Sequence, residues 1–579
     1  MIAEAAEAAR LGPAERTAAL AALTGAEHQV LVVGGGVVGA GVALDAATRG
    51  LSVGLLEERD FASGTSSASS KLIHGGLRYL EQLNLGLVRE ALTERGLLLQ
   101  RIAPHLVRPV PFLFPLSHRV WERAYVGAGV SLYDSLGFSL GQPRGLPGHR
   151  QLSRRGALRL APALKRSAIT GAVAYWDAQV DDARYVATLA RTAAGYGARL
   201  ASRTRVTGFL REGERVTGVR AVDLESGAEL QIRAQQVVNA TGVWTDDIQA
   251  LVGGRGIINV RASKGVHLVV PRDRIHASTG IITRTPQSVL LVIPWGRHWI
   301  VGTTDSDWSG DRAHPTVTGD DIDYLIGQAN LVLSLPLTRE DVTAVYAGLR
   351  PLLAGESEET SRLSREHVVA SPVPGLVMVA GGKYTTYRLM ARDAVDAVAH
   401  GLDWRVPESC TDRVPLAGAD GYVALWNARH RIAESSGLHV ARIEHLLHRY
   451  GSLISEVLAL IAASPDLGRP VTGADDYLRA EIVYAASHEG ARHLEDVLAR
   501  RTRIAIETPD QGLSAAREAA ALMTRPLRWD SRQAAAELEE YQAAVAASRA
   551  VRELPAGALA DGSGPAGPRA GDSLPRGGH

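Results

Sequence analysis

The sequence is poor in features that mark several classes of protein. Its 579 residues include a single cysteine, Cys410. One cysteine excludes an internal disulfide framework and a cysteine-rich zinc or iron–sulfur site, and it fits a reducing compartment. Lys and Arg number 63 against 62 for Asp and Glu, which leaves a net charge of +1. Such a chain has no overall field that attracts nucleic acid, so any anion site must be local. We expect neither nucleic acid nor a metal as a partner.

Long apolar runs and a secretory leader are also missing. No segment approaches the run of about 18 apolar residues that a membrane-spanning helix needs. Charged residues break the Ala-rich N-terminus before the apolar part of a leader can form, namely Glu4, Glu7, Arg10, Glu15 and Arg16. These absences predict a cytoplasmic protein, and they leave open a peripheral position on the inner face of the cell membrane.

The residues that are present describe a globular chain of several domains. Hydrophobic residues make up 46% and charged residues 22% of the sequence, as in ordinary soluble proteins, and the length predicts two to four domains. Short alternating stretches between turns predict strands over 204–239 and 285–305, whereas the pattern over 420–550 is helical. Residues 1–27 read as a helical extension, for which a frayed appendage is the default expectation. The tail past 553 has few large apolar residues and is expected to be disordered.

A glycine-rich turn follows the first strongly apolar strand, where QVLVV leads directly into GGGVVG. In dinucleotide-binding folds the glycine at Gly34 permits the tight turn, Gly36 lets the backbone approach a pyrophosphate, and Gly39 lets the next helix pack close to the sheet. A second strand over 53–56 ends at Glu57, at the spacing where a carboxylate accepts hydrogen bonds from ribose hydroxyls. The pattern predicts a bound dinucleotide, but it does not separate NAD from FAD.

Three further segments favour FAD. Residues 64–76 are dense in hydroxyls and glycine, which can hydrogen-bond groups that extend beyond an NAD-sized site. After the strand that ends at 239, small residues let the backbone pass close to a cofactor. A Gly-Gly-Lys turn precedes a predicted helix over 384–400, whose N-terminus can stabilise negative charge on a reduced flavin. Besides the fingerprint residues, the expected cofactor contacts are Thr65, Ser66, Ser67, Ser70, Thr241, Gly242 and Gly382.

Several longer stretches resemble one family. SSASSKLIHGGLRYLE at 66–81 is similar to a signature of aerobic, FAD-dependent glycerol-3-phosphate dehydrogenases. The same resemblance continues along the chain in the family's order, in WDAQVDDAR at 176–184, SKGVHLVVP at 263–271, IPWGRHWIVGTTD at 293–305, YAGLRPL at 346–352, GGKYTTYR at 381–388 and HEGARHLEDVLARRTR at 488–503. Together these stretches cover about residues 28–550, whereas the N-terminal extension and the tail have no counterpart that we recognise.

The resemblance implies an α/β flavoprotein with two lobes and a Rossmann-type FAD-binding domain. A β-sheet substrate domain is inserted between stretches of that domain, and a helical domain follows. The implied boundaries are 1–27 for the N-terminal extension, 28–100, 165–246 and 343–404 for the FAD-binding domain, 101–164 and 247–342 for the substrate (cap) domain, 405–552 for the C-terminal helical domain, and 553–579 for the disordered tail. The implied reaction is oxidation of sn-glycerol 3-phosphate to dihydroxyacetone phosphate by hydride transfer to FAD, with a quinone as the electron acceptor.

Such a substrate carries a phosphate dianion, which calls for arginine or lysine, with arginine favoured for its bidentate fork. By the resemblance, Arg78, Tyr79, Arg350 and Lys383 line the substrate pocket, and Arg350 and Lys383 also take part in catalysis. Lys264 lies in a family motif as well, but solvated surface charge is its favoured interpretation.

The substrate hydroxyl also needs a base, and His267 is the first choice. An unperturbed imidazole has a pKa of about 6.5 and accepts a proton near neutrality. In the strand-like stretch over 266–270, alternation turns His267 to the face opposite Val266 and Leu268. A hydrogen-bonded structural histidine is the alternative interpretation.

The same motifs fit other functions. A glycerol-3-phosphate oxidase would hand its electrons to oxygen, and a catalytically silent flavin sensor would bind FAD without turnover. Loss of Arg350 or Lys383 would favour the sensor, and both are present. The oligomeric state is open, with a homodimer as one expectation. The candidate membrane contact is the stretch 104–136, where the basic Arg108, Arg119 and Arg123 lie among the aromatic Phe112, Phe114, Trp121 and Tyr125. The alternative is that the apolar residues of this stretch pack inside the substrate domain.

Overall fold

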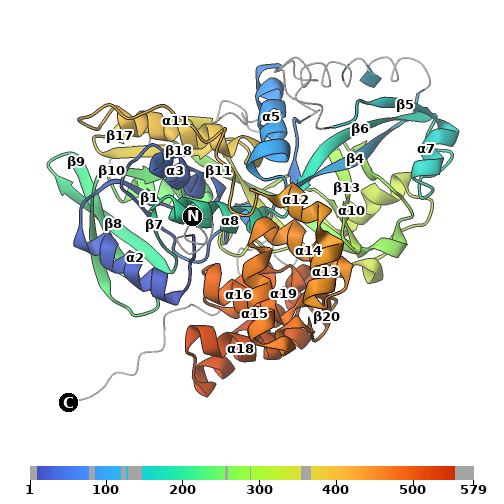
Figure 1. Ribbon diagram of the computed structural model, residues 1–579. Helices are drawn as coiled ribbons and strands as arrows, with labels where there is room; N and C mark the ends of the chain where they lie inside the picture. The colour runs from blue at the N-terminus through green and yellow to red at the C-terminus, as the bar shows by residue number, and fades with distance from the viewer. Residues whose placement is uncertain are drawn as a thin grey trace.

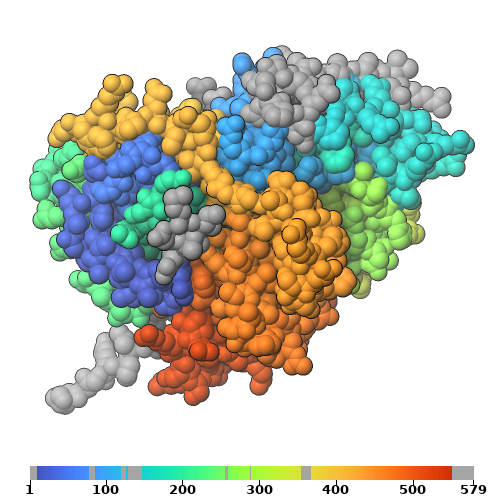
Figure 2. All heavy atoms as spheres, in the orientation of Figure 1, coloured from blue at the N-terminus to red at the C-terminus, as the bar shows by residue number. Residues whose placement is uncertain are grey.

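The computed structural model describes residues 9–76, 85–118, 126–127, 129, 146–253, 258–286, 289–353 and 367–553. Within these ranges the chain forms two large β-sheets and a helical domain at its C-terminal end (Figure 1). The orange surface of the helical domain borders both the blue and the green parts of the chain (Figure 2). The predicted α/β architecture with a following helical domain is confirmed.

The first sheet has eight strands, with the order β17–β18–β10–β1–β2–β7 along its main path. Its central strand β1, His28–Val33, runs parallel to β2 on one side and to β10 on the other. Val30, Leu31 and Val32 are fully buried, so both faces of β1 are covered, and the strand therefore reads as a continuous apolar run. The other strands are β2 (Val53–Leu56), β7 (Arg199–Ala201), β8 (Thr204–Glu212), β9 (Arg215–Asp223), β10 (Glu229–Asn239), β17 (His367–Val373) and β18 (Leu376–Gly381).

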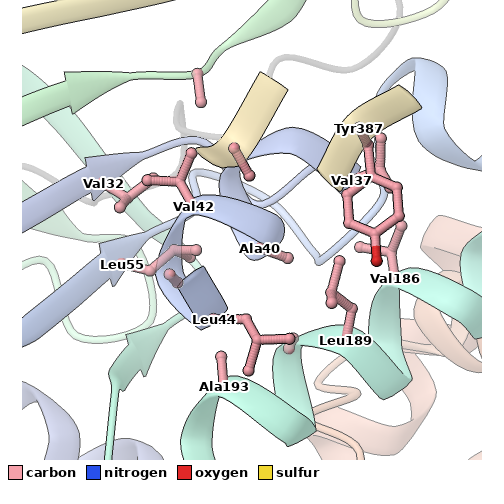
Figure 3. Packing of buried hydrophobic residues seen from close by; sticks show 14 of the residues in the cluster. Val32, Val37, Ala40, Val42, Leu44, Leu55, Val186, Leu189, Ala193 and Tyr387 are labelled. Carbon is pink, nitrogen blue, oxygen red and sulfur yellow. The ribbon is translucent and has the colours of Figure 1, made fainter. Parts of the chain in front are cut away.

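Helices cover one face of this sheet, and a β-meander covers the other. Figure 3 shows Val32 and Leu55 of the sheet in one buried cluster with Leu189 of helix α8. Leu31 faces the opposite way and packs with the meander formed by β8, β9 and the start of β10. The helices of this part are α3 (Val37–Thr48), α5 (Leu85–Leu97), α8 (Asp182–Gly195), α9 (Thr245–Ala250) and α11 (Tyr387–Ala399).

The second sheet has ten strands and is mostly antiparallel. Its main order is β15–β11–β14–β13–β12–β4–β6–β3, with β16 paired to β11 and β5 paired to β6. Leu268 of β11 packs on one face with helices α7 and α10, and Phe112 of β4 packs on the other. The elements are β3 (Leu72–Ile73), β4 (Val107–Leu116), β5 (Arg150–Ser153), α7 (Arg154–Leu160), β6 (Gly171–Val180), β11 (Val260–Pro271), β12 (Gly280–Arg284), β13 (Val289–Trp295), β14 (His298–Gly302), β15 (Ser306–Asp307), α10 (Gly319–Val332) and β16 (Ala344–Leu353).

Three strands of the second sheet come from stretches that the resemblance assigns to the FAD-binding domain. These strands are β3, β6 and β16. β6 pairs with β4 along its whole length, and β16 does the same with β11. Alternation in a sequence indicates a strand but not its partner, so the sequence did not show which sheet these strands join.

The C-terminal domain contains a stretch, Val440–Ala463, that is long and apolar enough to cross a membrane by length and composition. Its helix is interrupted at Gly451, where φ is 56°, and Leu447 and Val457 are fully buried in the helical core. We therefore assign this stretch to the core of the domain. The domain consists of α12 (Tyr422–Asn427), α13 (Arg429–Ser436), α14 (Val440–Tyr450), α15 (Ile454–Ala463), β19 (Pro470–Val471), β20 (Ala474–Leu478), α16 (Arg479–His488), α17 (Ile504–Glu507), α18 (Leu513–Leu527) and α19 (Ser531–Glu553).

The N-terminal extension is not a frayed appendage, contrary to the default expectation. It forms helix α2, Pro13–Gly25, which begins with a proline whose missing N–H costs nothing in the first turn. Leu23 is fully buried in the same cluster as Leu31 of β1, and Arg16 forms an ion pair of 2.5 Å with Asp223 at the end of β9. The helix is therefore part of the core of the first sheet. The predicted tail after 553 lies outside the described residues.

Candidate active site

A cavity of about 520 Å³ lies between the two sheets. Its walls come from the turn after β1, the segment between β2 and β3, the ends of β10 and β18, and strands β11 and β16. Gly39 and Ser67 do not line it, and Arg78 and Tyr79 lie outside the described residues. The predicted site residues that line the cavity are Gly34, Gly36, Glu57, Thr65, Ser66, Ser70, Thr241, Gly242, His267, Arg350, Gly382 and Lys383.

Gly39 does not line the cavity, but its missing side chain allows the turn that does. A Cβ atom on Gly39 would lie 1.9 Å from the carbonyl oxygen of Gly34, which no side chain can tolerate. Gly34 has a φ of 107°, a conformation that favours glycine. Helix α3 therefore starts directly on the turn, and its first residue, Val37, lines the cavity. The amides and the positive end of the helix dipole at such a helix start favour a phosphate.

Glu57 is held in place by two backbone N–H groups. Gly35 donates to one carboxylate oxygen over 2.6 Å, and Arg59 donates to the other over 2.8 Å. Burial raises the pKa of Glu57, and these two hydrogen bonds oppose the rise. Because the carboxylate lines the cavity just after β2, it occupies the position where a ribose hydroxyl is bound in dinucleotide sites.

The hydroxyl-rich segment after β2 connects the two sheets. Ser66 Oγ accepts a hydrogen bond of 3.0 Å from the N–H of Val37, at the start of α3. Thr65 Oγ1 donates to the carbonyl of Leu349 in β16. Both side chains line the cavity, so this segment forms its wall where the first sheet meets the second.

Ser67, one of the predicted cofactor contacts, does not line the cavity. Its hydroxyl donates to the carbonyl of Gly64 over 3.4 Å, and its own carbonyl accepts from Lys71 over 2.8 Å. Thr65–Ser67 forms a short helical turn, which directs successive side chains to different sides. A run of hydroxyl residues in a sequence does not show which of them face a ligand.

His267 lies on β11 with its imidazole at the cavity wall and is only 2% exposed. Its Nε2 lies 2.8 Å from Ser70 Oγ. The ring stacks on Tyr346 of β16, with centroids 4.8 Å apart and planes at 12°. Burial lowers the pKa of His267 well below 6.5, and the charges of Arg350 and Lys71 lower it further. The imidazole is therefore neutral at pH 7.

Arg350 is held by a loop that follows β14. Its guanidinium donates to Thr303 Oγ1 over 3.0 Å and to the Thr304 carbonyl over 3.2 Å, and it lies 3.4 Å from a carboxylate oxygen of Asp305. About a quarter of the side chain is exposed. The arrangement fixes a cation at the cavity wall, on the strand next to His267.

Lys383 reaches the cavity through a double-glycine turn. Gly381 and Gly382 have φ values of 78° and 74°, and a Cβ on Gly382 would lie 2.4 Å from the sulfur of Met390. The turn ends β18 and leads into α11. As a result Lys383 lines the cavity together with His267 and Arg350.

The sequence favoured a solvated surface charge for Lys264, but the structure does not show one. The lysine is buried, its Nζ lies 2.7 Å from an oxygen of Asp321 in α10, and it stands 5.1 Å from the ring centre of Trp308. It does not line the cavity. We therefore assign it to the packing of the second sheet.

Sequence reasoning missed the groups that hold His267. The groups are Tyr346, Lys71 and Asp182. The signal that could have found them is their position within stretches that resemble the family. Nothing in their spacing shows that Lys71 and Asp182 meet as a buried ion pair of 2.8 Å, because the two residues come from different segments of the chain.

Comparison with known proteins identifies the family. A family model described as FAD dependent oxidoreductase matches residues 29–390, and one described as the C-terminal domain of alpha-glycerophosphate oxidase matches residues 409–534. Glycerol-3-phosphate dehydrogenase 2 of Mycobacterium tuberculosis is 57% identical over 540 residues, which cover 93% of this chain and 92% of that protein. The chain belongs to the FAD-dependent glycerol-3-phosphate dehydrogenase family.

More distant members of the glycerol-3-phosphate dehydrogenase family match over most of the chain. The human mitochondrial glycerol-3-phosphate dehydrogenase is 35% identical over 550 residues, 91% of this chain and 74% of that protein. The solved structure of the Bacillus halodurans glycerol-3-phosphate dehydrogenase complexed with FAD has a TM-score of 0.76 at 28% identity, covering 92% of this chain and 98% of that one. L-alpha-glycerophosphate oxidase from Mycoplasma pneumoniae shares the fold, with a TM-score of 0.54 at 19% identity over 68% of this chain and 99% of that one.

FAD is the cofactor of this flavoprotein family, and the cavity of this chain fits it. At Gly36 a Cβ would lie only 3.2 Å from Ser66 Oγ, so a side chain there would crowd the turn. Without that side chain, the backbone of the turn can approach a pyrophosphate. Glu57 offers a fixed carboxylate to a ribose, and Lys383 offers a cation to the flavin end. The residues present therefore supply, within one cavity, a hydrogen-bond acceptor for a ribose, a backbone turn for a pyrophosphate and a positive charge for a reduced flavin.

Gly39→Ala tests this account of the cofactor site. The new methyl group must displace the Gly34 carbonyl, which moves the turn and weakens FAD binding by about tenfold or more. The measurement is flavin absorbance per mole of purified protein, followed by titration of the apoprotein with FAD. Gly25→Ala is the matched control, because a Cβ there meets nothing within 4 Å. Equal FAD content in both variants would contradict the role given to Gly39.

Proposed function

We propose that this protein oxidises sn-glycerol 3-phosphate to dihydroxyacetone phosphate with FAD and passes the electrons to a quinone. The observation that carries the proposal is the meeting of a neutral imidazole with two cations, His267 with Arg350 and Lys383, at the wall of the cavity that contains the dinucleotide fingerprint. The names of its relatives, glycerol-3-phosphate dehydrogenases, support the choice of substrate.

The two cations bind and orient the substrate. A phosphate dianion accepts charge-assisted hydrogen bonds from the guanidinium of Arg350 and the ammonium of Lys383. With Arg350 held by Thr303 and Thr304, little side-chain entropy is lost on binding. Bound FAD supplies the acceptor for the hydride that leaves the carbon atom of the secondary alcohol.

His267 takes the hydroxyl proton through Ser70, whose Oγ lies 2.8 Å from Nε2 and which lines the same cavity: the serine hydroxyl gives its proton to Nε2 and receives the proton of the substrate. An imidazole in that place must be neutral to accept a proton. Burial and the charges of Arg350 and Lys71 keep it neutral by lowering its pKa. The pKa of His267 therefore lies below the value of about 6.5 of an unperturbed imidazole.

His267→Asn should slow reduction of the flavin by about 10²–10⁴-fold, the usual effect of losing a general base. In the unaltered protein the base is neutral above pH 6.5, so we expect a level rate there and a fall as the pH drops through the lowered pKa of His267. His267→Asn should lose this acid limb while it retains FAD. Anaerobic stopped-flow absorbance across pH 5–9 measures both effects, with the exposed His276→Asn as the control. An unchanged acid limb in His267→Asn would return this residue to a structural role.

Arg350→Ala and Lys383→Ala should each lower kcat/KM for glycerol 3-phosphate by about ten- to 150-fold, because each removes a charge-assisted hydrogen bond to the phosphate. Both variants should keep bound FAD. The exposed Arg339→Ala, which removes an ion pair with Asp323 in the same part of the protein, is the matched control. Wild-type kcat/KM in both cavity variants would refute the phosphate site.

An oxidase is the second candidate function, because the family model that matches residues 409–534 is named for alpha-glycerophosphate oxidase. Oxidation of the alcohol would be the same, and the two functions differ in what reoxidises the flavin. After anaerobic reduction by glycerol 3-phosphate, we expect a soluble quinone to reoxidise the flavin faster than air-saturated buffer does. Faster reoxidation by oxygen, with stoichiometric peroxide, would establish the oxidase instead.

A quinone acceptor also requires contact with a membrane, so we propose that the protein docks on the inner face of the cell membrane. Phe112 and Phe114 of the stretch 104–136 are buried in the second sheet, so they are not the contact, whereas Arg119 and Trp121 lie outside the described residues. Flotation with anionic liposomes at low salt tests the proposal, with Arg119, Trp121 and Arg123 replaced together by alanine. Binding that is absent, or that survives this replacement, would exclude the stretch as the membrane contact.

A further inference from the structure

A buried lysine that takes no direct part in the proposed proton transfer lies next in sequence to Ser70, which contacts His267. Lys71 is fully buried, and its Nζ donates to both oxygens of Asp182 over 2.8 and 3.0 Å and to the carbonyl of Ser67 over 2.8 Å. Its φ of 59° is unusual for a residue other than glycine. A buried ion pair seldom stabilises a fold more than an apolar pair of the same size does. Stability alone therefore does not account for a charge in this place.

Asp182 links Lys71 to the segment that touches His267. Its Oδ2 accepts hydrogen bonds from the backbone N–H and the hydroxyl of Ser69, over 3.0 and 2.7 Å. Ser69 and Lys71 are thus both tied to the same carboxylate. Ser70 stands between them and lines the cavity, where its Oγ lies 2.8 Å from His267 Nε2.

Tyr346 provides a second connection between this segment and the imidazole. Lys71 Nζ lies 4.8 Å from the centre of the Tyr346 ring, and the same ring stacks on His267. The tyrosine hydroxyl donates to the carbonyl of Ser69 over 3.0 Å. The segment therefore holds His267 at a ring nitrogen through Ser70 and on a ring face through Tyr346.

The other side of Asp182 is covered by an arginine from the C-terminal helical domain. Arg503 donates to Asp182, and it donates to Asp181 over 2.9 and 2.6 Å. Arg449 of the same domain lies 3.4 Å from Asp181. Burial alone would raise the pKa of Asp181, but Arg503 and Arg449 lower it far below its usual range. The Asp181 carboxylate is therefore ionised, and side chains of the C-terminal domain contact both carboxylates.

We propose that Asp182, Lys71 and Arg503 are positioning residues through which the C-terminal helical domain holds His267 in place for proton transfer. Arg503 orients the Asp182 carboxylate, the carboxylate fixes residues 69–71, and these residues hold the imidazole. The inference rests on the proposed function, because it assigns these residues to the base of that reaction.

Lys71 also contributes a charge to the surroundings of the base. Burial lowers the pKa of Lys71 to about 8, Arg503 lowers it as well, and Asp182 opposes both, so the lysine is still charged at pH 7. The charges of Arg350 and Lys71 disfavour the imidazolium form of His267. Removing the Lys71 charge therefore raises the pKa of His267. Tyr346 stacks on the imidazole, and Asp305 pairs with Arg350. The other titratable groups among the described residues that line the same cavity are Glu57, Glu58, Arg59, His74, Asp247, Lys383 and Tyr384.

The first test replaces Lys71. In Lys71→Met the acid limb of flavin reduction should move to higher pH by roughly one unit, whereas Lys71→Arg, which keeps the charge, should stay near the unaltered protein. The same shift can be measured without substrate by titrating the 15N resonances of His267 in FAD-loaded protein, assigned through their loss in His267→Asn. A lysine that only stabilises the fold would change thermal unfolding and leave both titrations unmoved, and that result would overturn the proposal.

The second test addresses the C-terminal domain. Arg503→Met should lower kcat with little change in KM for glycerol 3-phosphate, and it should move the His267 titration in the same direction as Lys71→Met. Arg492→Met is the matched control, because Arg492 also joins the C-terminal domain to the first-sheet part, through Glu225 at 2.8 Å, at a place remote in sequence from 69–71. Equal effects of the two replacements on kcat would overturn the positioning role of Arg503.

Tyr346→Phe serves where the charge variants lose FAD or fail to fold. It keeps the ring that stacks on His267 and leaves every charge in place, but it removes the hydrogen bond to Ser69. We expect slower flavin reduction with FAD still bound and an altered His267 titration. A wild-type rate and titration would overturn the proposal. If glycerol 3-phosphate does not reduce the unaltered protein, the proposed function fails, and the 15N titration still decides this inference by itself.

Discussion

Buried ion pairs between the C-terminal helical domain and the rest of the chain hold its parts around one cavity. Asp60, which follows β2, accepts hydrogen bonds from Arg500 and Arg501 over 2.6 to 2.8 Å, and Arg184 of α8 pairs with Glu489. An unpaired buried charge costs several kcal/mol, so separating the domains would leave Asp60 and Arg184 without their counter-charges. The walls of the cavity are therefore fixed relative to one another.

Each of the two sheets supplies a different set of residues to the cavity. The first sheet supplies the fingerprint turn and Glu57, and the second supplies His267 and Arg350. On the antiparallel strands β11 and β16, His267 is paired with Tyr346, and Arg350 is paired with Ser263. Because residues two or four positions apart on a strand share a face, the base and the cation project from the same side of the sheet. Their spacing is set by strand register, which a local change in the loops cannot alter.

Local signals in the sequence predicted the features that depend on local structure. The glycine turn and Glu57 depend on neighbours close in sequence, and they lie where the fingerprint placed them. The sequence also assigned Arg350 and Lys383 to one site through resemblance to a family, and it proposed His267 from the chemistry of the imidazole and the alternation of its strand. It did not show that β6 belongs to the second sheet, because alternation does not name a partner strand.

The parts that sequence reasoning missed depend on contacts between distant segments. Lys71 and Asp182 meet only after the start of α8 packs against the segment that follows β2, and no spacing rule marks a buried ion pair. Ser67 belongs to a run of hydroxyls of which only some face the cavity. Burial also moved the pKa of His267 away from the value of a free imidazole, an effect that requires the packed structure.

The central claim is that the bound flavin is reduced by glycerol 3-phosphate in this cavity. The most direct measurement is the absorbance spectrum of the purified, FAD-loaded protein under anaerobic conditions, first with glycerol, then with glycerol 3-phosphate, and finally with dithionite. The account predicts that glycerol leaves the oxidised flavin spectrum unchanged and that glycerol 3-phosphate bleaches it to the level that dithionite produces. A spectrum that only dithionite bleaches would contradict the account.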